Sequence, residues 1–458
     1  MLIMFITRFL GDLKNSITIR FGLIDNLNYL TVIISILIQG IYLEPAEVGA
    51  FYISTLPSFL LLALTAQSLS LTVLRDKDVI SKFPSAKLNS LWYTAYLFIL
   101  VFLLISNSNI SGIATNYIII PCIMLHSFYE LNSLVCEANQ QRRGHYLRVP
   151  CVRVISSFTS LVCLWWFLEA GLGIMSLYYW LAISGFIKYV AYRFYNEEVN
   201  GQIDMKSLML HFKNHSTYSF LNFSARNIDQ YLFTFILGST YVGIYSRSIQ
   251  VTQLPLKVLN GLISGLFLPR GVVKNAGVNL EGIDKNQYWI VLIACGIAIF
   301  YKLVLVDVLV LIWGEKWAQL STSLNYMAPA MIIQSIIAYK SAYAVIGNQD
   351  YILPKVGLIN LITILPVPIA AAMYGFESAI MTYSLSYILL GYPFYEIWVG
   401  RHISGYSYSR VGYQIAIISI PIAMTLAGGT DFPGALIIAF SGWLLVISIS
   451  IFNLFIRR

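Results

Sequence analysis

Long runs of apolar residues, separated by short polar segments, repeat along the whole chain. Each run is close to the roughly 20 residues that an α-helix needs to cross a bilayer. The first six predicted spans lie near 21–43, 48–74, 89–107, 112–136, 150–168 and 172–192. The others lie near 215–238, 242–269, 287–311, 319–345, 354–374, 377–398, 411–428 and 433–455. The pattern therefore predicts an all-α polytopic membrane protein with about fourteen transmembrane helices.

The composition supports a surface that faces lipid. Charged residues make up 11% of the chain and hydrophobic residues 58%, with a mean hydropathy of +0.73. A soluble domain would carry about 25% charged residues. The positions left between spans suffice for short loops only. The sequence contains no Walker A loop, no His-Glu-x-x-His and no nucleophile elbow, which argues against an ATP-driven pump and against an enzyme.

The chain shows no sign of a metal or cofactor site. Its five cysteines are scattered through apolar segments without paired or metal-ligand spacing, so we expect them to be core residues. Residues 1–20 mix apolar and basic side chains, a mixture typical of an interfacial helix that leads into the first span.

The distribution of basic residues predicts the orientation. With the N-terminus inside, the cytoplasmic segments hold 24 of the 29 Lys and Arg residues, as the positive-inside rule requires. The outside loops hold Glu44, Glu47, Glu169, Glu315, Glu377 and Asp431, with Lys316 as the exception. Both termini are thus expected in the cytoplasm of a multi-pass protein. This bias accounts for the net charge of +8, so nucleic-acid binding is not expected.

A duplication divides the chain. LEPAEVGAFY (43–52) resembles LGSTYVGIYS (237–246) at an offset of 194 residues, and both second spans contain an internal proline, Pro57 and Pro255. A steady offset across a helix indicates a repeat, and an even number of spans per copy makes it a parallel one. We therefore expect six-helix bundles at 21–192 and 214–400, a cytoplasmic linker at 193–213, and helices 13 and 14 within 401–458.

Polar side chains form stripes along several predicted spans. In the seventh span the polar positions are spaced by three or four residues and so share one helix face. Charges at mid-membrane cost at least about 2.5 kcal/mol each, so we expect them to line a hydrated cleft between the bundles. The candidate cargo-binding cations are Arg226, Arg247, Lys257 and Lys302. The candidate cavity or coupling residues are Asp25, Asn28, Glu130, Asn222, Asp229, Gln250 and Gln253.

Structural roles compete with these assignments. Arg226 and Asp229 are three residues apart and could neutralise one another. Arg247 lies near a helix end and could reach the headgroups. Lys257 is deeper and has no acidic neighbour on its own helix, and Lys302 does not face Asp307. Cations at mid-depth favour an anionic cargo such as a phosphate or pyrophosphate.

Several of these segments resemble Wzx-type polysaccharide flippases. The likeness covers NIDQYLFTFILGSTYVGIYSRSIQVTQLPLKVL (227–259), LFLPR (266–270), LEPAEVGAFY and WGEKW (313–317). It implies the fold of the multidrug/oligosaccharidyl-lipid/polysaccharide exporter superfamily. It also implies a bacterial inner-membrane flippase that moves an undecaprenyl-pyrophosphate-linked oligosaccharide from the cytoplasmic to the periplasmic leaflet by alternating access. A polysaccharide polymerase and a ligase are candidate partners.

Three other functions are compatible with parts of the sequence. A cation-coupled multidrug exporter would share the fold and would favour an acidic cavity; Asp25 and Glu130 support it, whereas Arg226, Arg247 and Lys257 oppose it. A lipid II flippase is a closer alternative. A membrane glycan polymerase or ligase would need a large catalytic outer loop, and the predicted outer loops are short.

Overall fold

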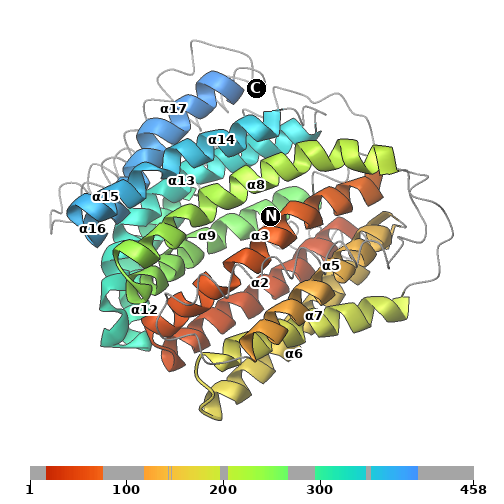
Figure 1. Ribbon diagram of the computed structural model, residues 1–458, viewed down its shortest axis with the longest axis horizontal. Coiled ribbons are helices and arrows are strands. Elements are labelled where there is room, and N and C mark those ends of the chain that lie inside the picture. The colour runs from red at the N-terminus through yellow and green to blue at the C-terminus, as the bar shows by residue number, and fades with distance from the viewer. Residues whose placement is uncertain are drawn as a thin grey trace, which may run out of the picture. The chain divides into compact units, whose positions relative to one another are not determined.

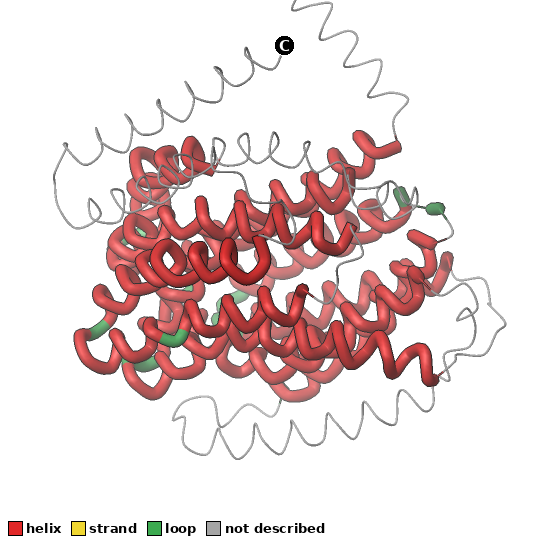
Figure 2. Tube along the Cα trace, turned by 90° about the horizontal axis from the view of Figure 1, so that it is seen from above, coloured by secondary structure: helices red, strands yellow, loops and turns green. Residues whose placement is uncertain are grey.

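The computed structural model describes residues 17–75, 118–142, 144–145, 147–195, 205–266, 294–346 and 352–400. Within these ranges the secondary structure is helical, and Figure 2 shows helices joined by short loops. Three predicted spans, near 89–107, 411–428 and 433–455, lie outside the described residues, as does most of the predicted interfacial helix. The described helices coincide with the other eleven predicted spans in whole or in part, and the all-α fold class is confirmed.

The chain separates into two compact units. Unit 1 comprises Met1–Leu43 and Ala50–Phe223, and unit 2 comprises Glu44–Gly49 and Ser224–Arg458. The helices in the first part of the chain are α2 (Ile17–Tyr42), α3 (Pro45–Arg75), α5 (Ile119–Arg142), α6 (Arg148–Glu169) and α7 (Met175–Tyr195). The boundaries between the units fall inside two helices, α3 and α8 (Met205–Ile236).

Unit 2 continues from α8 into a second series of helices (Figure 1). These are α9 (Ser239–Leu266), η1 (Tyr301–Leu305), α12 (Val306–Trp313), η2 (Glu315–Trp317), α13 (Ala318–Ile346), α14 (Leu353–Ile364), α15 (Pro366–Tyr374), α16 (Phe376–Ser386), η4 (Tyr387–Gly391), α17 (Tyr392–Tyr395) and η5 (Glu396–Gly400). The middle of α13 is the core of this unit, because Met327, Ala330 and Ile333 are fully buried.

The linker predicted at 193–213 is largely helical where it is described. α7 continues to Tyr195, and α8 begins at Met205. The segment MKSLMLHFK (205–213) contains good helix formers, so its lysines extend the helix beyond the apolar window instead of marking a loop.

Among the described residues, four helical segments are long and apolar enough to cross a membrane, by length and composition alone. They are Ile24–Tyr42, Pro45–Leu64, Arg148–Glu169 and Leu353–Tyr374. On one of them, α6, the large side chains Ile155, Phe158, Val162 and Trp166 are exposed and recur at helical spacing. Such an exposed apolar stripe is suited to contact with lipid. Other helices, such as α8, are long enough but not apolar enough along their length, because polar residues interrupt them.

The structure supports the duplication at the turn between α2 and α3 and at the turn between α8 and α9, which together we call the duplicated corner. α2 ends at Tyr42 and α3 begins at Pro45, while α8 ends at Ile236 and α9 begins at Ser239. Both pairs of boundaries differ by the predicted offset of 194 residues. In the second copy Gly238 has a φ of 88°, and its N–H donates to the carbonyl oxygen of Phe233. This left-handed conformation ends α8 and favours glycine.

The proline inside α9 leaves one backbone carbonyl oxygen without its usual N–H donor, and a side chain of a neighbouring helix donates to that oxygen instead. Pro255 has no N–H, so it cannot donate to the carbonyl oxygen of Val251, four residues earlier. The hydroxyl of Tyr301, at the start of η1, donates to that oxygen at 2.7 Å. A buried polar group in a membrane needs such a partner, and this contact allows α9 to continue through the proline.

Candidate functional site

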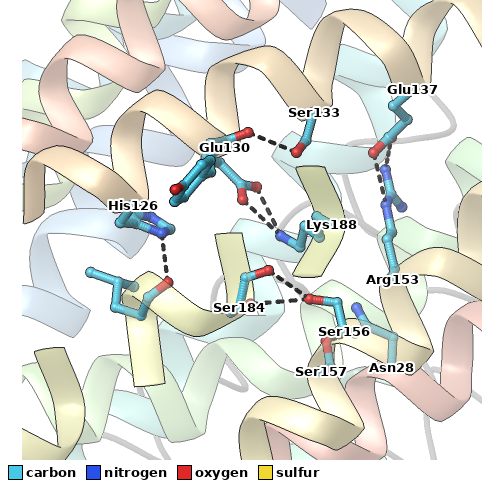
Figure 3. Close-up of polar contacts among 12 residues, drawn as sticks. Asn28, His126, Glu130, Ser133, Glu137, Arg153, Ser156, Ser157, Ser184 and Lys188 are labelled. Atoms are coloured by element: carbon cyan, nitrogen blue, oxygen red, sulfur yellow. Dashed lines mark hydrogen bonds and ion pairs between the residues drawn. The ribbon is translucent and has the colours of Figure 1, made fainter. Parts of the chain in front are cut away.

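Buried and half-buried charges in unit 1 are joined by an arginine that contacts two carboxylates. Arg153 of α6 lies 3.2 Å from the carboxylate of Asp25 on α2 and also forms an ion pair with Glu137 of α5. Its Nε donates to Glu137 at 3.3 Å, and the hydroxyl of Tyr192 on α7 lies 3.5 Å from the same carboxylate. The cluster therefore connects four helices (Figure 3 shows the Arg153–Glu137 contact).

A second ion pair connects α5 to α7 (Figure 3). The Nζ of Lys188 lies 2.8 Å and 3.0 Å from the two carboxylate oxygens of Glu130. One turn away, the Nδ1 of His126 lies 2.9 Å from the carbonyl oxygen of Leu181. An unpaired charge is costly in a membrane. Lys188 therefore stabilises Glu130, as Arg153 stabilises Asp25 and Glu137.

These contacts change the interpretation of three predicted residues. Asp25 and Glu130 are paired with Arg153 and Lys188. Both cations were among the residues that the sequence assigned to cytoplasmic segments. Asn28 accepts a 2.5 Å hydrogen bond from Ser157. Spacing along one helix could not have found these partners, because each lies on another helix far away in the chain.

Unit 2 stabilises its buried carboxylate in another way. Asp229 of α8 is 1% exposed and accepts a hydrogen bond from the hydroxyl of Tyr245 on α9. Its other oxygen accepts from the backbone N–H of Gln230 at 2.8 Å. The side chain of Gln230 in turn accepts from Ser246 at 3.0 Å. These side chains form a polar contact between α8 and α9, of which the sequence had singled out Asp229 but not its partner Tyr245.

Arg247 is buried as well, at 1% exposure. It donates to Gln250 at 2.9 Å, and its guanidinium lies 5.9 Å from the ring centre of Trp317. Trp317 also packs against Trp313, with the ring centres 5.3 Å apart. Arg247 is therefore anchored under η2 and does not extend to a surface, unlike the alternative in which it reaches the headgroups. The sequence did not predict its contact with Gln250.

The remaining candidates are less enclosed or lie outside the description. Arg226 is exposed on α8, and Asn222 and Gln253 are partly buried. Lys257 lies on α9 and Lys302 on η1, but their side chains are outside the described residues. In the part of the chain that is described, no group of three or more His, Cys, Asp or Glu side chains is placed to hold a metal ion.

Known proteins with the same fold are membrane transporters. The fold resembles that of "Lipid II flippase MurJ, inward closed conformation", with a TM-score of 0.63 and 13% identity over 96% of this chain and 100% of that one. It also resembles an inward-facing multidrug resistance MATE family transporter of the MOP superfamily. There the TM-score is 0.61, with 13% identity over 82% of this chain and 94% of the other.

A sequence family provides the more specific assignment. A search of curated proteins finds no match. The family model described as "Polysaccharide biosynthesis protein" matches residues 42–322, which is more than half of the chain. This range includes the duplicated corner, the α8–α9 polar contacts and the charged residues of unit 1 apart from Asp25. The chain therefore belongs to the polysaccharide biosynthesis protein family, and it shares the fold of these multi-pass membrane transporters.

Proposed function

We propose that this protein is a flippase for an undecaprenyl-pyrophosphate-linked oligosaccharide. It moves the repeat unit from the cytoplasmic to the periplasmic leaflet of a bacterial inner membrane, by alternating access, and delivers it for polymerisation. The family match and the fold support a transporter in polysaccharide biosynthesis. The motifs in α8 and α9 support the carrier lipid and the direction.

The pairing of the acids in unit 1 is the observation that favours an anionic cargo. Asp25 and Glu137 share Arg153, and Glu130 is paired with Lys188. Carboxylates neutralised in this way offer little attraction to a cationic drug. A pyrophosphate cargo, in contrast, requires guanidinium and ammonium groups that can be reached.

Cations on α8, α9 and η1 are the proposed contacts with the cargo. Arg226 is exposed on α8 and can offer two parallel hydrogen bonds to a phosphate. Lys257 and Lys302 are assigned to the same role. Arg247 lies beneath Trp317, so its contact with cargo would require that ring to move.

Two alternatives keep specific support. A cation-coupled multidrug exporter is favoured by the likeness to MATE transporters and by the buried carboxylate of Asp229, held by Tyr245. A lipid II flippase is favoured by the likeness to a protein of that title. Both alternatives share the fold with the proposed flippase, so the identity of the transported molecule is what distinguishes the three functions.

Deletion of the gene tests the proposal directly. Loss of a surface polysaccharide, with its lipid-linked repeat units trapped on the cytoplasmic side, is the expected result. A defect in peptidoglycan instead would favour the lipid II alternative. Increased sensitivity to cationic drugs with normal surface glycan would favour the exporter.

Lys257 provides a sharper test in the complemented strain. Replacement by Ala removes a charge with little change in helix propensity, so the protein should accumulate normally. Losing a charge-assisted contact should reduce transport roughly tenfold or more. Lys257→Arg should retain more activity than Lys257→Gln. Full activity of all three variants would remove Lys257 from the cargo site.

A further inference from the structure

Two aromatic residues and an acid meet where α2 and α6 end in unit 1. The hydroxyl of Tyr42, the last residue of α2, donates a hydrogen bond to Oε1 of Glu169, the last residue of α6. The indole of Trp165, one turn before Glu169, interacts with the same hydroxyl. Because an indole can only donate, its N–H faces the Tyr42 oxygen. These three side chains, which we call the outer aromatic group, are thus joined at the predicted outer end of both helices.

The rings of the outer aromatic group are left uncovered. Tyr42 is 39% and Trp165 50% exposed, and Glu169 is exposed as well. The chain then turns at Gly171, whose φ is 75°, and a Cβ atom added there would meet nothing within 4 Å. Holding exposed side chains in one arrangement costs rotamer freedom, and exposed hydrogen bonds offset little of that cost. The group is therefore better suited to binding a ligand than to stabilising the fold.

An aromatic belt at the lipid headgroups would orient these residues differently. In such a belt the rings of Trp and Tyr lie in lipid, and their N–H and O–H groups face headgroups and water. Trp166 fits this description, since it is 65% exposed and continues the apolar stripe of Phe158 and Val162 on α6. The polar atoms of Tyr42 and Trp165 instead face one another and a carboxylate. Their ring faces and the carboxylate are what the group offers to a ligand.

Exposed rings beside a carboxylate match the chemistry of a sugar. A pyranose ring has a face of C–H bonds, which packs on an aromatic ring, and a rim of hydroxyl groups, which donate to a carboxylate. The carboxylate of Glu169 can accept about four hydrogen bonds, and Tyr42 uses one of them. Small-molecule sites combine aromatic surfaces with a few placed polar groups in this way. Because the negative charge disfavours an acidic sugar, the match is to a neutral one.

We propose that the outer aromatic group is a binding site for a neutral sugar of the cargo. The ring of Trp165 stacks on the sugar, Glu169 accepts hydrogen bonds from its hydroxyl groups, and Tyr42 positions the carboxylate. This inference rests on the proposed function, in which the glycan emerges on the periplasmic side while its lipid stays in the bilayer. The sugars then lie in the layer where α2 and α6 end, and the site holds one of them before the repeat unit leaves.

Binding of simple sugars to the purified protein tests the site without transport. The full chain in lipid nanodiscs is mixed with the methyl glycosides of glucose, galactose, mannose and N-acetylglucosamine. Saturation-transfer NMR then records which C–H groups contact the protein. At least one glycoside should give a signal, and Trp165→Ala should reduce that signal by at least about fivefold, the loss of a stacked ring. Trp165→Phe keeps a ring and should retain more of it.

Trp166→Ala is the matched control for the loss of a tryptophan. Trp166 is at least as exposed as Trp165 and is its neighbour on α6, but it lies outside the site. The glycoside signal of this variant should equal that of the unaltered protein. Thermal unfolding should be the same for both alanine variants, so that a lost signal reports binding and not a loss of structure.

Glu169 provides a test in which two sugars respond in opposite directions. Glu169→Gln keeps the shape of the side chain but replaces a charged acceptor by a neutral one, so the affinity for the neutral glycoside should fall about tenfold. The same change removes a repulsive charge, so methyl glucuronide should bind the variant better than it binds the unaltered protein. Tyr42→Phe keeps the ring but removes the hydrogen bond that positions Glu169, so it should weaken neutral binding less than Glu169→Gln does.

Three results would each overturn the site. None of the four glycosides gives a signal that depends on Trp165, or Trp165→Ala and Trp166→Ala reduce the signal equally, or Glu169→Gln shifts the neutral and acidic glycosides in the same direction. In each case the proposed function still stands if the chain restores surface glycan to the deletion strain. If the glycosides bind as expected but deletion leaves the surface glycan intact, the sugar site stands, and its assignment to this cargo falls with the proposed function.

Discussion

The two units stabilise buried charge by different means. In unit 1, the acids Asp25, Glu130 and Glu137 are joined to Arg153 and Lys188. In unit 2, Asp229 is held by the hydroxyl of Tyr245, and Arg247 by Gln250 and the ring of Trp317. Ion pairs neutralise charge and fasten helices together. Contacts with hydroxyl, amide and aromatic groups stabilise a charge without cancelling it, which is consistent with the proposal that cations of unit 2 contact the cargo.

Removing Arg153 should have the largest effect on stability. Arg153→Ala would leave the buried Asp25 and the half-buried Glu137 together without their cation, and breaking such a pair costs up to about 3 kcal/mol. We expect a marked fall in the thermal unfolding temperature of the purified protein and in its accumulation. Arg193→Ala is the matched control, because Arg193 is exposed at the end of α7. Equal stability of the two variants would contradict the comparison between the units.

Variants of Lys188 and Glu130 test whether the charges of unit 1 serve only to hold its helices together. Lys188→Met should lower the free energy of unfolding by about 2 kcal/mol, because Glu130 loses its partner. Adding Glu130→Gln should recover most of this loss and restore transport. A double variant that is stable but inactive would instead give this pair a role in coupling.

In unit 2, removing a charge should reduce transport and leave stability unchanged, whereas in unit 1 it should reduce stability. Arg226→Ala should reduce transport roughly tenfold, the loss of a charge-assisted contact. If Arg226 merely neutralised Asp229, then Arg226→Ala with Asp229→Asn would restore activity. We expect the double variant to remain inactive at normal accumulation, since Asp229 is held by Tyr245. Transport of lipid-linked glycan in the deletion strain measures both variants, and recovery in the double variant would remove Arg226 from the cargo site.

The sequence predicted the helices well because each apolar run is close to the length that a membrane-crossing helix needs. It also predicted the duplicated corner, where the helix boundaries follow the offset of 194 residues. Glu44 and Lys316, both predicted outside, lie together as expected of loops on one side.

The ion pairs were not predictable from spacing on a single helix. Arg153 lies within α6, five residues after Arg148, but the positive-inside count assigned it to a cytoplasmic loop. Its partners are on α2 and α5, and only packing brings them together. The close approach of Gly49 and Gly243 was missed for the same reason: the repeat identified the motif, but a sequence offset does not reveal that its two copies touch.

The smallest effect should come from the hydroxyl of Tyr301, which tests how unit 2 satisfies a backbone group without charge. Tyr301→Phe keeps the ring but leaves the carbonyl of Val251 without this donor, a loss of about 1 kcal/mol in the free energy of unfolding. Tyr241→Phe is the control, since the ring of Tyr241 packs on Phe376. In a Pro255→Ala background the new N–H at position 255 can donate to the same carbonyl. The cost of Tyr301→Phe should therefore fall to roughly half, measured by thermal unfolding in detergent as a double-mutant cycle. An equal loss in both backgrounds would show that the hydroxyl does not serve the carbonyl freed by the proline.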